Sequence, residues 1–318
     1  EIKLGVYYCH IGGDRLLIGA ADGLFVIKEK KIYKAFVRAN AIFPIRQNLD
    51  TLIAFTDFGI FRLRAQGNKY LTIDTISTHT TDQISNIVQD VNGDLWLAGA
   101  DNLLHVKSLD DNFNKIGIAT YDTSDGLPAG GSYPPYLIKN KIVIGTDNGI
   151  YTQDKKTNRF IQDDTFGNLF TGKDVKPIVE DSSGNIWISS YYRTGRLTRD
   201  EMGNYQFDYT FSLRMDDKNV WTIYPDNNGI VWVGTTKGLI RYATKVHKDY
   251  HIDFQTLVRK VLVNHDSTIF SGTYYDDAGK SGAVQPDELK PVLDYADNSI
   301  LFQYSATNYE KESQNKFS

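Results

Sequence analysis

A unit of about 43 residues recurs along this chain of 318 residues, and no other feature restricts its fold as strongly. The clearest copies begin at Ile84, Val175 and Val220, and each holds a tryptophan near its middle. Weaker copies carry an aliphatic residue at that position. A fixed period of about 40 to 45 residues is typical of the blades of a β-propeller. The residues aligned at the tryptophan position lie 36 to 47 residues apart, with a mean of 43: Leu17, Ile53, Trp96, Val143, Trp187 and Trp232.

Every copy follows one local pattern. An apolar stretch leads to a polar turn, such as 90–93 or 181–184, and then to the strand with the tryptophan. Asp, Asn and Gly favour such turns because they form local hydrogen bonds or adopt positive φ. The 40 aromatic residues and 26 Gly also favour strands and turns over helices. We therefore predict an all-β chain in which residues 1–254 form a β-propeller of about six four-stranded blades, or seven if an upstream segment adds one.

The tryptophans of the repeat are predicted to be structural. A single blade cannot bury both of its faces, so the large residue of its second strand should pack against the neighbouring blade. We assign this interblade role to Trp96, Trp187 and Trp232. The first strand of each blade should line the central channel.

Three segments of the repeat carry a resemblance to a known family. The runs "DSSGNIWISS", "DNNGIVWVGTTKGLIRY" and "YDTSDGLPAGG" resemble the two-component regulator propeller repeats of bacterial sensor ectodomains, of the type found in Bacteroidetes. The resemblance implies a periplasmic, extracytoplasmic domain that senses a glycan fragment for a hybrid two-component system. It also implies a membrane-anchored parent whose histidine kinase lies downstream, so that this chain itself is not an enzyme.

The C-terminal residues 255–318 resemble the start of the triple-tyrosine domain that follows such propellers. The resemblance lies in "VRKVLVNHDSTIFSG" and "LDYADNSILFQYSATNYEKESQNKF". Ile300, Phe302 and Tyr304 alternate with Leu301 and Gln303, as expected of a strand in a β-sandwich. We expect an incomplete sandwich here.

Charge and hydropathy exclude several classes of partner. With 35 basic and 39 acidic residues and no basic block, the chain is not expected to bind nucleic acid. No stretch reaches the ~18 apolar residues that cross a bilayer, so no direct membrane contact is expected. The chain begins at Glu1 without a Met or an apolar leader, which we interpret as a piece of a longer protein. The lone Cys9 cannot form an internal disulfide and is expected to be a small core residue.

No catalytic, metal or cofactor site is predicted. His247 and His251 have a helical metal-pair spacing, but they fall where a strand is expected. The segment 90–94 resembles a calcium loop without its glycine position or closing Glu, so a hairpin turn is the better interpretation. A propeller lyase of the streptogramin type remains an alternative. Its catalytic base would need a partner at the channel mouth, whereas His105 is expected to pack or to be exposed.

One end of the propeller is the expected place for a ligand. Turns from second to third strand share this end with the connections between blades, and an alignment on Trp187 and Gly195 makes the turn of blade five two residues longer than the others. Aromatic faces and a guanidinium suit a sugar. The candidate ligand-binding residues on this end are Tyr133, Tyr191, Tyr192, Arg193 and Trp221.

The alternative to an oligosaccharide site is a docking surface. Its partner would be an adjacent propeller or a second copy of the chain. A large exposed apolar patch would favour docking, whereas a concave pocket with aromatic and charged residues would favour a ligand.

Overall fold

The computed structural model describes most of the chain: residues 6–12, 14–20, 23–37, 39–45, 49–77, 84–108, 115–166, 168–191, 193–215, 219–246, 254–275, 278–282 and 291–307. The chain divides into two compact units, Glu1–Lys245 and Val246–Ser318. Our predicted boundary after residue 254 follows a segment, 247–253, that lies outside the described residues. Within the described part, no helix has the length and apolar character needed to span a membrane.

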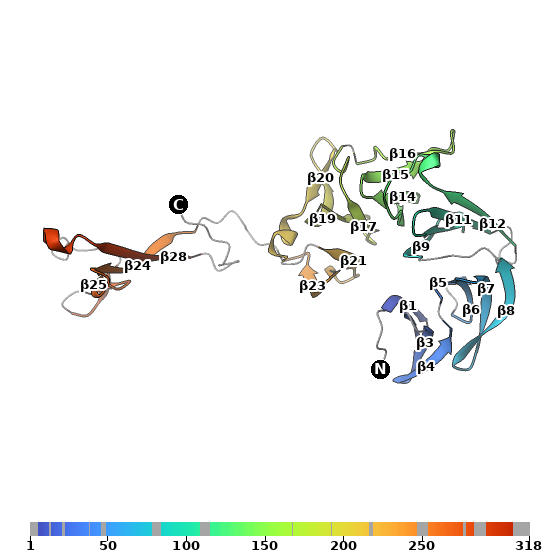
Figure 1. Cartoon of the computed structure of the whole chain (residues 1–318), viewed down its shortest axis with the longest axis horizontal. Coiled ribbons are helices and arrows are strands. Elements are labelled where there is room, and N and C mark those ends of the chain that lie inside the picture. The colour runs from blue at the N-terminus through green and yellow to red at the C-terminus, as the bar shows by residue number, and fades with distance from the viewer. Residues whose placement is uncertain are drawn as a thin grey trace. The chain divides into compact units, whose positions relative to one another are not determined.

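The first unit is built from six antiparallel sheets, which follow one another along the chain as blades one to six (Figure 1). In each sheet the order of the strands in space is their order in the chain. Blades one to three consist of β1 (Val6–Gly12), β2 (Arg15–Ala20), β3 (Gly23–Lys28) and β4 (Lys31–Phe36); β5 (Ala41–Pro44), β6 (Thr51–Thr56), β7 (Gly59–Gln66) and β8 (Lys69–Ser77); and β9 (Asn86–Gln89), β10 (Leu95–Ala98), β11 (Leu103–Ser108) and β12 (Ile116–Tyr121).

Blades four and five again have four strands, and three strands are described in blade six. They consist of β13 (Pro135–Ile138), β14 (Lys141–Thr146), β15 (Gly149–Gln153) and β16 (Phe160–Gln162); β17 (Val175–Glu180), β18 (Ile186–Ser190), β19 (Arg193–Arg199) and β20 (Tyr205–Asp208); and β21 (Val220–Pro225), β22 (Ile230–Thr235) and β23 (Gly238–Ala243). Short 3-10 turns occur at Thr123–Asp125 and Thr210–Arg214. The all-β propeller architecture is thus confirmed.

Hydrophobic clusters join each blade to the next. Alternation along the strands produces them, since one face of a strand meets the preceding blade and the other face meets the following one. Trp96 packs with Leu127 and Ile144 of blade four, and Trp187 packs with Val231 and Val233 of blade six. Both tryptophans are at most 5% exposed. Both indoles thus lie between their own blade and the next.

Trp232, the third tryptophan to which we assigned an interblade role, is packed differently and requires a correction. Its side chain is only half-buried, and none of the core clusters of described residues includes it. The strand alternation places Val231 and Val233 against blade five and Trp232 on the opposite face. No later blade of the first unit covers that face within the described residues.

The second unit contains a three-stranded antiparallel sheet in the order β25 (Ser267–Phe270), β24 (Thr256–Val263) and β28 (Ile300–Ala306). A small hairpin pairs β26 (Tyr274–Tyr275) with β27 (Ser281–Gly282), and a 3-10 turn spans Tyr295–Asp297. On β28 the neighbours Leu301 and Phe302 are both exposed, although they point to opposite faces. The described part of this unit is therefore a β segment with exposed apolar faces. Its assignment to a triple-tyrosine domain stays a prediction.

Candidate ligand-binding site

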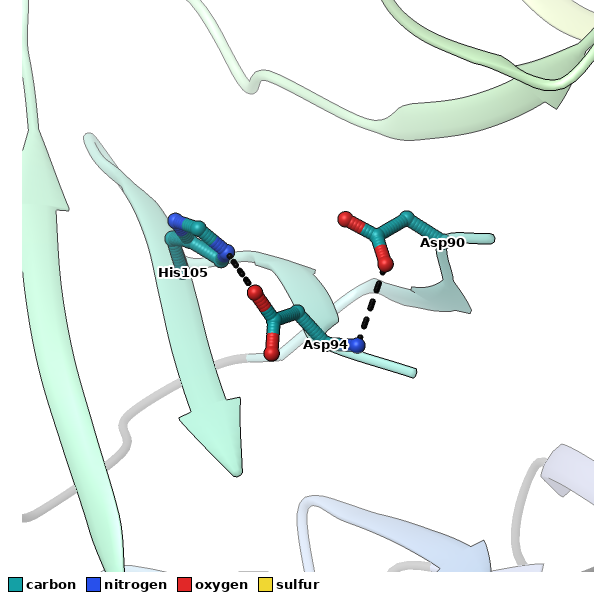
Figure 2. Close-up of side chains that lie close together, drawn as sticks. All are labelled: Asp90, Asp94 and His105. Atoms are coloured by element: carbon teal, nitrogen blue, oxygen red, sulfur yellow. Dashed lines mark hydrogen bonds and ion pairs between the residues drawn. The ribbon is translucent and has the colours of Figure 1, made fainter. Parts of the chain in front are cut away.

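One compact group of polar side chains lies in blade three. The ligand atoms of Asp90, Asp94 and His105 all lie within 4.8 Å of one another (Figure 2). His105 Nε2 is 3.1 Å from Asp94 Oδ2, and its ring stacks on Trp96 with centroids 3.9 Å apart. Burial lowers the pKa of His105, although the bond with Asp94 partly offsets this. These residue types can ligate a divalent cation, provided that the oxygens of Asp90 are not already engaged.

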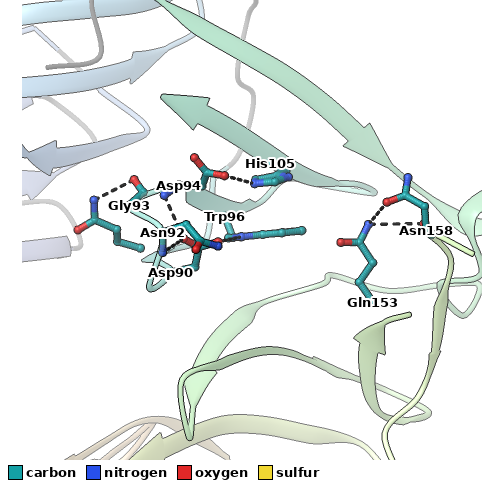
Figure 3. Close-up of polar contacts among 9 residues, drawn as sticks. Asp90, Asn92, Gly93, Asp94, Trp96, His105, Gln153 and Asn158 are labelled. Carbon is teal, nitrogen blue, oxygen red and sulfur yellow. Dashed lines mark hydrogen bonds and ion pairs between the residues drawn. The ribbon is translucent and has the colours of Figure 1, made fainter. Parts of the chain in front are cut away.

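The carboxylate of Asp90 holds the turn and the tryptophan of its blade together. Its Oδ1 accepts hydrogen bonds from the backbone N–H groups of Asn92 at 2.8 Å and Asp94 at 3.0 Å. Its Oδ2 accepts one from the indole of Trp96 at 3.2 Å (Figure 3). The side chain of Asp90 thus closes the turn and also orients the indole.

The same set of hydrogen bonds recurs in two further blades, where the described residues contain no comparable cluster of His, Asp and Glu side chains. Asp181 accepts from the backbone of Ser183 and Asn185 and from the indole of Trp187. Asp226 does the same in blade six, where the positions of Asp94 and His105 are taken by Ile230 and Arg241. Since the arrangement persists without a His or a second Asp, it is structural. The predicted hairpin turn at 90–94 and the packing role of His105 agree with this geometry.

A cavity of about 580 Å³ lies in the first unit, at the end predicted for a ligand. The first strands of blades three to six contact one another in sequence, and the cavity lies where they begin. The end of β18 and its hairpin complete the wall. The lining residues are Ser85, Ser132, Pro134, Tyr136, Asp174, Lys176, Pro177, Ser189, Ser190, Tyr191, Asn219, Val220 and Trp221.

The hairpin of blade five has no insertion, which corrects our alignment. Ser190 pairs with Arg193, so the loop holds two residues. Thr56 pairs with Gly59 in blade two, and Thr235 pairs with Gly238 in blade six, which gives loops of the same length. The error came from Gly195, which does not correspond to those glycines. It lies within β19, where a Cβ would come 2.2 Å from a backbone oxygen of β20.

This hairpin differs from those of blades two and six in which of its residues adopts a positive φ. Blades two and six place glycine directly after the loop, with φ of 137° at Gly59 and 143° at Gly238. Blade five has Arg193 there and adopts φ of 46° at Tyr191 instead. A bulky residue in this region costs about 1 to 3 kcal/mol. The ring of Tyr191 is 70% exposed and lines the cavity.

The structure brings two of the five predicted ligand residues to the cavity, Tyr191 and Trp221. Trp221 is 74% exposed. The expectation for Tyr133 needs a correction. Its side chain is buried, and its hydroxyl donates to the Pro128 carbonyl at 2.7 Å, so its ring cannot contact a ligand. The guanidinium of Arg193 lies 4.1 Å from the ring of Tyr209, away from the cavity lining. Tyr192 lies outside the described residues.

A charged group that the sequence did not reveal lies beside these aromatic rings. Lys176 Nζ is 2.6 Å from Asp147 Oδ1 and 3.5 Å from Asp174 Oδ1. Burial raises the pKa of Asp174, and Lys176 offsets this only partly. Burial lowers the pKa of Lys176, but its bonds to the two carboxylates outweigh this and raise it overall. Burial also raises the pKa of the Tyr136 phenol, and the charge of Asp174 adds to that shift.

Ser190 is the unusual residue of the lining. Its hydroxyl oxygen is buried and has no hydrogen-bond partner among the described residues, whereas Ser189 next to it accepts from the Thr194 hydroxyl at 3.1 Å. An unsatisfied buried polar group costs about 1 to 3 kcal/mol, so such a group needs an explanation. The sequence offered one signal for it: Ser189 and Ser190 replace the Gly-Thr pair found in blades four and six.

Comparison with known proteins supports the architecture. Residues 215–237 match the sequence model of the two component regulator propeller family. No curated protein matches the chain in sequence. The extracellular domain of the putative hybrid two component system BT3049 from B. thetaiotaomicron is similar in structure, with a TM-score of 0.56 and 16% identity, over 100% of this chain and 47% of that one.

Two further solved structures share the fold. PorZ, a surface component of the type-IX secretion system of Porphyromonas gingivalis, gives a TM-score of 0.54 at 13% identity, over 95% of this chain and 51% of that one. YCF48 bound to D1 peptide gives a TM-score of 0.55 at 9% identity, over 79% of this chain and 80% of that one. The chain thus spans about half the length of PorZ and of the BT3049 domain. At these identities the likeness is one of fold.

Proposed function

We propose that this chain is an extracytoplasmic ligand-sensing domain of a membrane-anchored two-component system, and that its ligand is a glycan fragment bound in the cavity of blades three to six. The match to the regulator propeller model and the fold shared with the BT3049 ectodomain support the sensing role. The parent protein would carry the kinase, so this chain is not an enzyme. The periplasm is the proposed compartment.

The observation that carries the proposal is the buried hydroxyl of Ser190 in the cavity wall. A buried oxygen without a partner among the described residues is rare in a site that serves only packing. A bound molecule with a hydroxyl group would supply that partner when the Ser190 side chain turns its oxygen into the cavity. The cavity also lies on the face formed by turns and interblade connections, where function in such scaffolds is usually located.

The exposed rings favour a sugar over a purely apolar ligand. Tyr191 and Trp221 are 70% and 74% exposed, and both line the cavity. Aromatic faces pack against the C–H faces of sugar rings, while the serine and carboxylate oxygens bind hydroxyl groups. This combination of aromatic and polar groups in a concave site is typical of ligand pockets.

A thermal-shift screen with oligosaccharides, followed by calorimetry, tests the proposal. A ligand at 100 times its Kd should stabilise the folded protein by about 2.7 kcal/mol. The double variant Tyr191→Ala, Trp221→Ala and the single variant Ser190→Ala should remain folded and lose most of this stabilisation. Phe58→Ala is the matched control, because Phe58 is 80% exposed in the corresponding hairpin of blade two. Unchanged affinity in both folded cavity variants would place the ligand elsewhere.

A second candidate function is docking through the face of blade six that carries Trp232, which no later blade covers among the described residues. Trp232 is half-buried there, beside Tyr224 at 65% and Leu239 at 67% exposure. The corresponding face of blade five packs on blade six, so an adjacent propeller or a second copy of the chain would suit this one. Sedimentation of the wild type and of Tyr224→Ser, Leu239→Ser tests it. Self-association that the double variant abolishes would support docking, and a monomeric wild type would leave only an adjacent propeller as partner.

A further inference from the structure

Two carboxylates and one ammonium group lie in the cavity wall and directly behind it. The carboxylates of Asp147 and Asp174 lie on two sides of the single ammonium group of Lys176, at 2.6 and 3.5 Å. Asp147 is in the hairpin of blade four, whereas Asp174 and Lys176 are at the start of β17. One ammonium balances one carboxylate. Among the described lining residues no other side chain is charged at neutral pH, so the second carboxylate has no counter-ion there.

The shorter contact shows which carboxylate is left over. Asp147 takes the strong hydrogen bond of Lys176, whereas Asp174 lies 3.5 Å away, beyond the usual range for a charge-assisted bond. Asp174 lines the cavity and Asp147 does not. The excess charge therefore faces the space that a ligand would fill.

The aromatic rings of the cavity wall add to the attraction that the excess carboxylate exerts on a cation. Tyr136, Tyr191 and Trp221 contribute three aromatic rings to the lining, and the faces of such rings are negative and attract cations. Lys176 is not available to an anionic ligand in the same way, because Asp147 already holds its ammonium group at 2.6 Å. An incoming carboxylate or sulfate would meet Asp174 and the aromatic faces.

We propose that this cavity selects ligands that carry a free amino group, such as amino sugars, over neutral or acidic ligands of the same size. The inference rests on the proposed function, because it concerns the same site. The ammonium group of the ligand pairs with Asp174, and its hydroxyl groups reach Ser190 and the neighbouring serines. Aromatic stacking on Tyr191 and Trp221 then adds affinity that does not depend on charge.

Three disaccharides of one linkage test the inference: β-1,4-linked glucosamine, glucose and glucuronate, titrated by calorimetry at pH 7 and low salt. We expect the amine to bind about tenfold tighter than the neutral sugar, and the acid to bind more weakly than both. Asp174→Asn should abolish this order while changing the affinity for the neutral sugar little. Asp147→Asn should also abolish this order, because it frees Lys176 to pair with Asp174 and to neutralise its charge. Glu201→Gln, an exposed acid in the turn between β19 and β20, is the control.

The outcomes separate this inference from the function on which it rests. If the wild type prefers the acid, binds all three sugars alike, or keeps its amine preference in Asp174→Asn, the inference is wrong and glycan sensing still stands. The same holds if only other, neutral or acidic oligosaccharides bind. If no oligosaccharide binds at all, the proposed function fails as well.

Discussion

At the scale of the residue, a single aspartate organises each of three blades. Asp90, Asp181 and Asp226 each accept two backbone N–H bonds and one indole bond. Burial raises the pKa of Asp181, but the bonds from Trp187, Asn185 and Ser183 outweigh it and lower the pKa below its ordinary value of 3.8. A depressed pKa means that the carboxylate stabilises the fold above pH 3.8, and that this contribution is lost as the pH falls through the folded-state value.

Replacing this aspartate should therefore cost more than replacing an aspartate that holds only a turn. We expect Asp181→Ala to destabilise the protein by about 2 to 3 kcal/mol at pH 7, because it frees a buried indole N–H as well as the turn. Asp200→Ala should cost about 1 kcal/mol, since Asp200 holds an exposed turn without an indole. Urea denaturation at pH 7 and pH 3 measures both. A cost for Asp181→Ala that does not shrink at pH 3 would contradict the assignment.

At the scale of the element, the hairpin of blade five carries strain that its function can explain. Tyr191 holds a positive φ that glycine would adopt freely. We expect Tyr191→Gly to stabilise the free protein by about 1 kcal/mol and to weaken glycan binding, because the aromatic wall is lost. Melting temperatures with and without ligand measure the two effects. A variant that gains stability and keeps full affinity would show that the ring has no part in binding.

The blades differ in how much their tryptophans contribute. Trp187→Ala should destabilise by about 3 to 5 kcal/mol, since the indole is buried against blade six. Trp232→Ala should cost less, about 1 to 2 kcal/mol, because its side chain stays partly exposed and belongs to none of the core clusters of described residues. Denaturation midpoints of the two variants give the comparison. Equal losses would mean that blade six is covered in solution.

At the scale of the whole molecule, the first unit should be sufficient for both folding and binding. The five core clusters formed by described residues and every lining residue of the cavity lie before residue 246. We expect the fragment 1–245 to unfold cooperatively and to show the same ligand-induced stabilisation as the full chain. Circular dichroism melts of both measure this. A fragment that is unfolded, or folded without binding, would show that the second unit contributes to the site.

The sequence predicted the propeller because its period and turn residues act locally. A turn with its tryptophan spans seven residues, so Trp96 and Trp187 could be assigned without any tertiary information. The site could not be assigned in this way, since Tyr136, Ser190 and Trp221 come from three blades and line one cavity only after folding. The expectations for Tyr133 and Trp232 differ from the structure for a related reason. Whether a neighbouring blade covers a ring depends on contacts that the local pattern does not contain.

The constant length of the hairpins bears on how such a domain diversifies. Four complete pairings, Thr56 with Gly59, Thr146 with Gly149, Ser190 with Arg193 and Thr235 with Gly238, leave two loop residues each. The loops read Asp-Phe, Asp-Asn, Tyr-Tyr and Thr-Lys, so their chemistry varies while the strand register does not. Exchanging a loop pair therefore alters the end of the propeller that holds the cavity and leaves the strand register unchanged. The two residues of each loop can therefore be substituted separately from those of the other loops. A combinatorial library restricted to these positions would test new ligands on one scaffold.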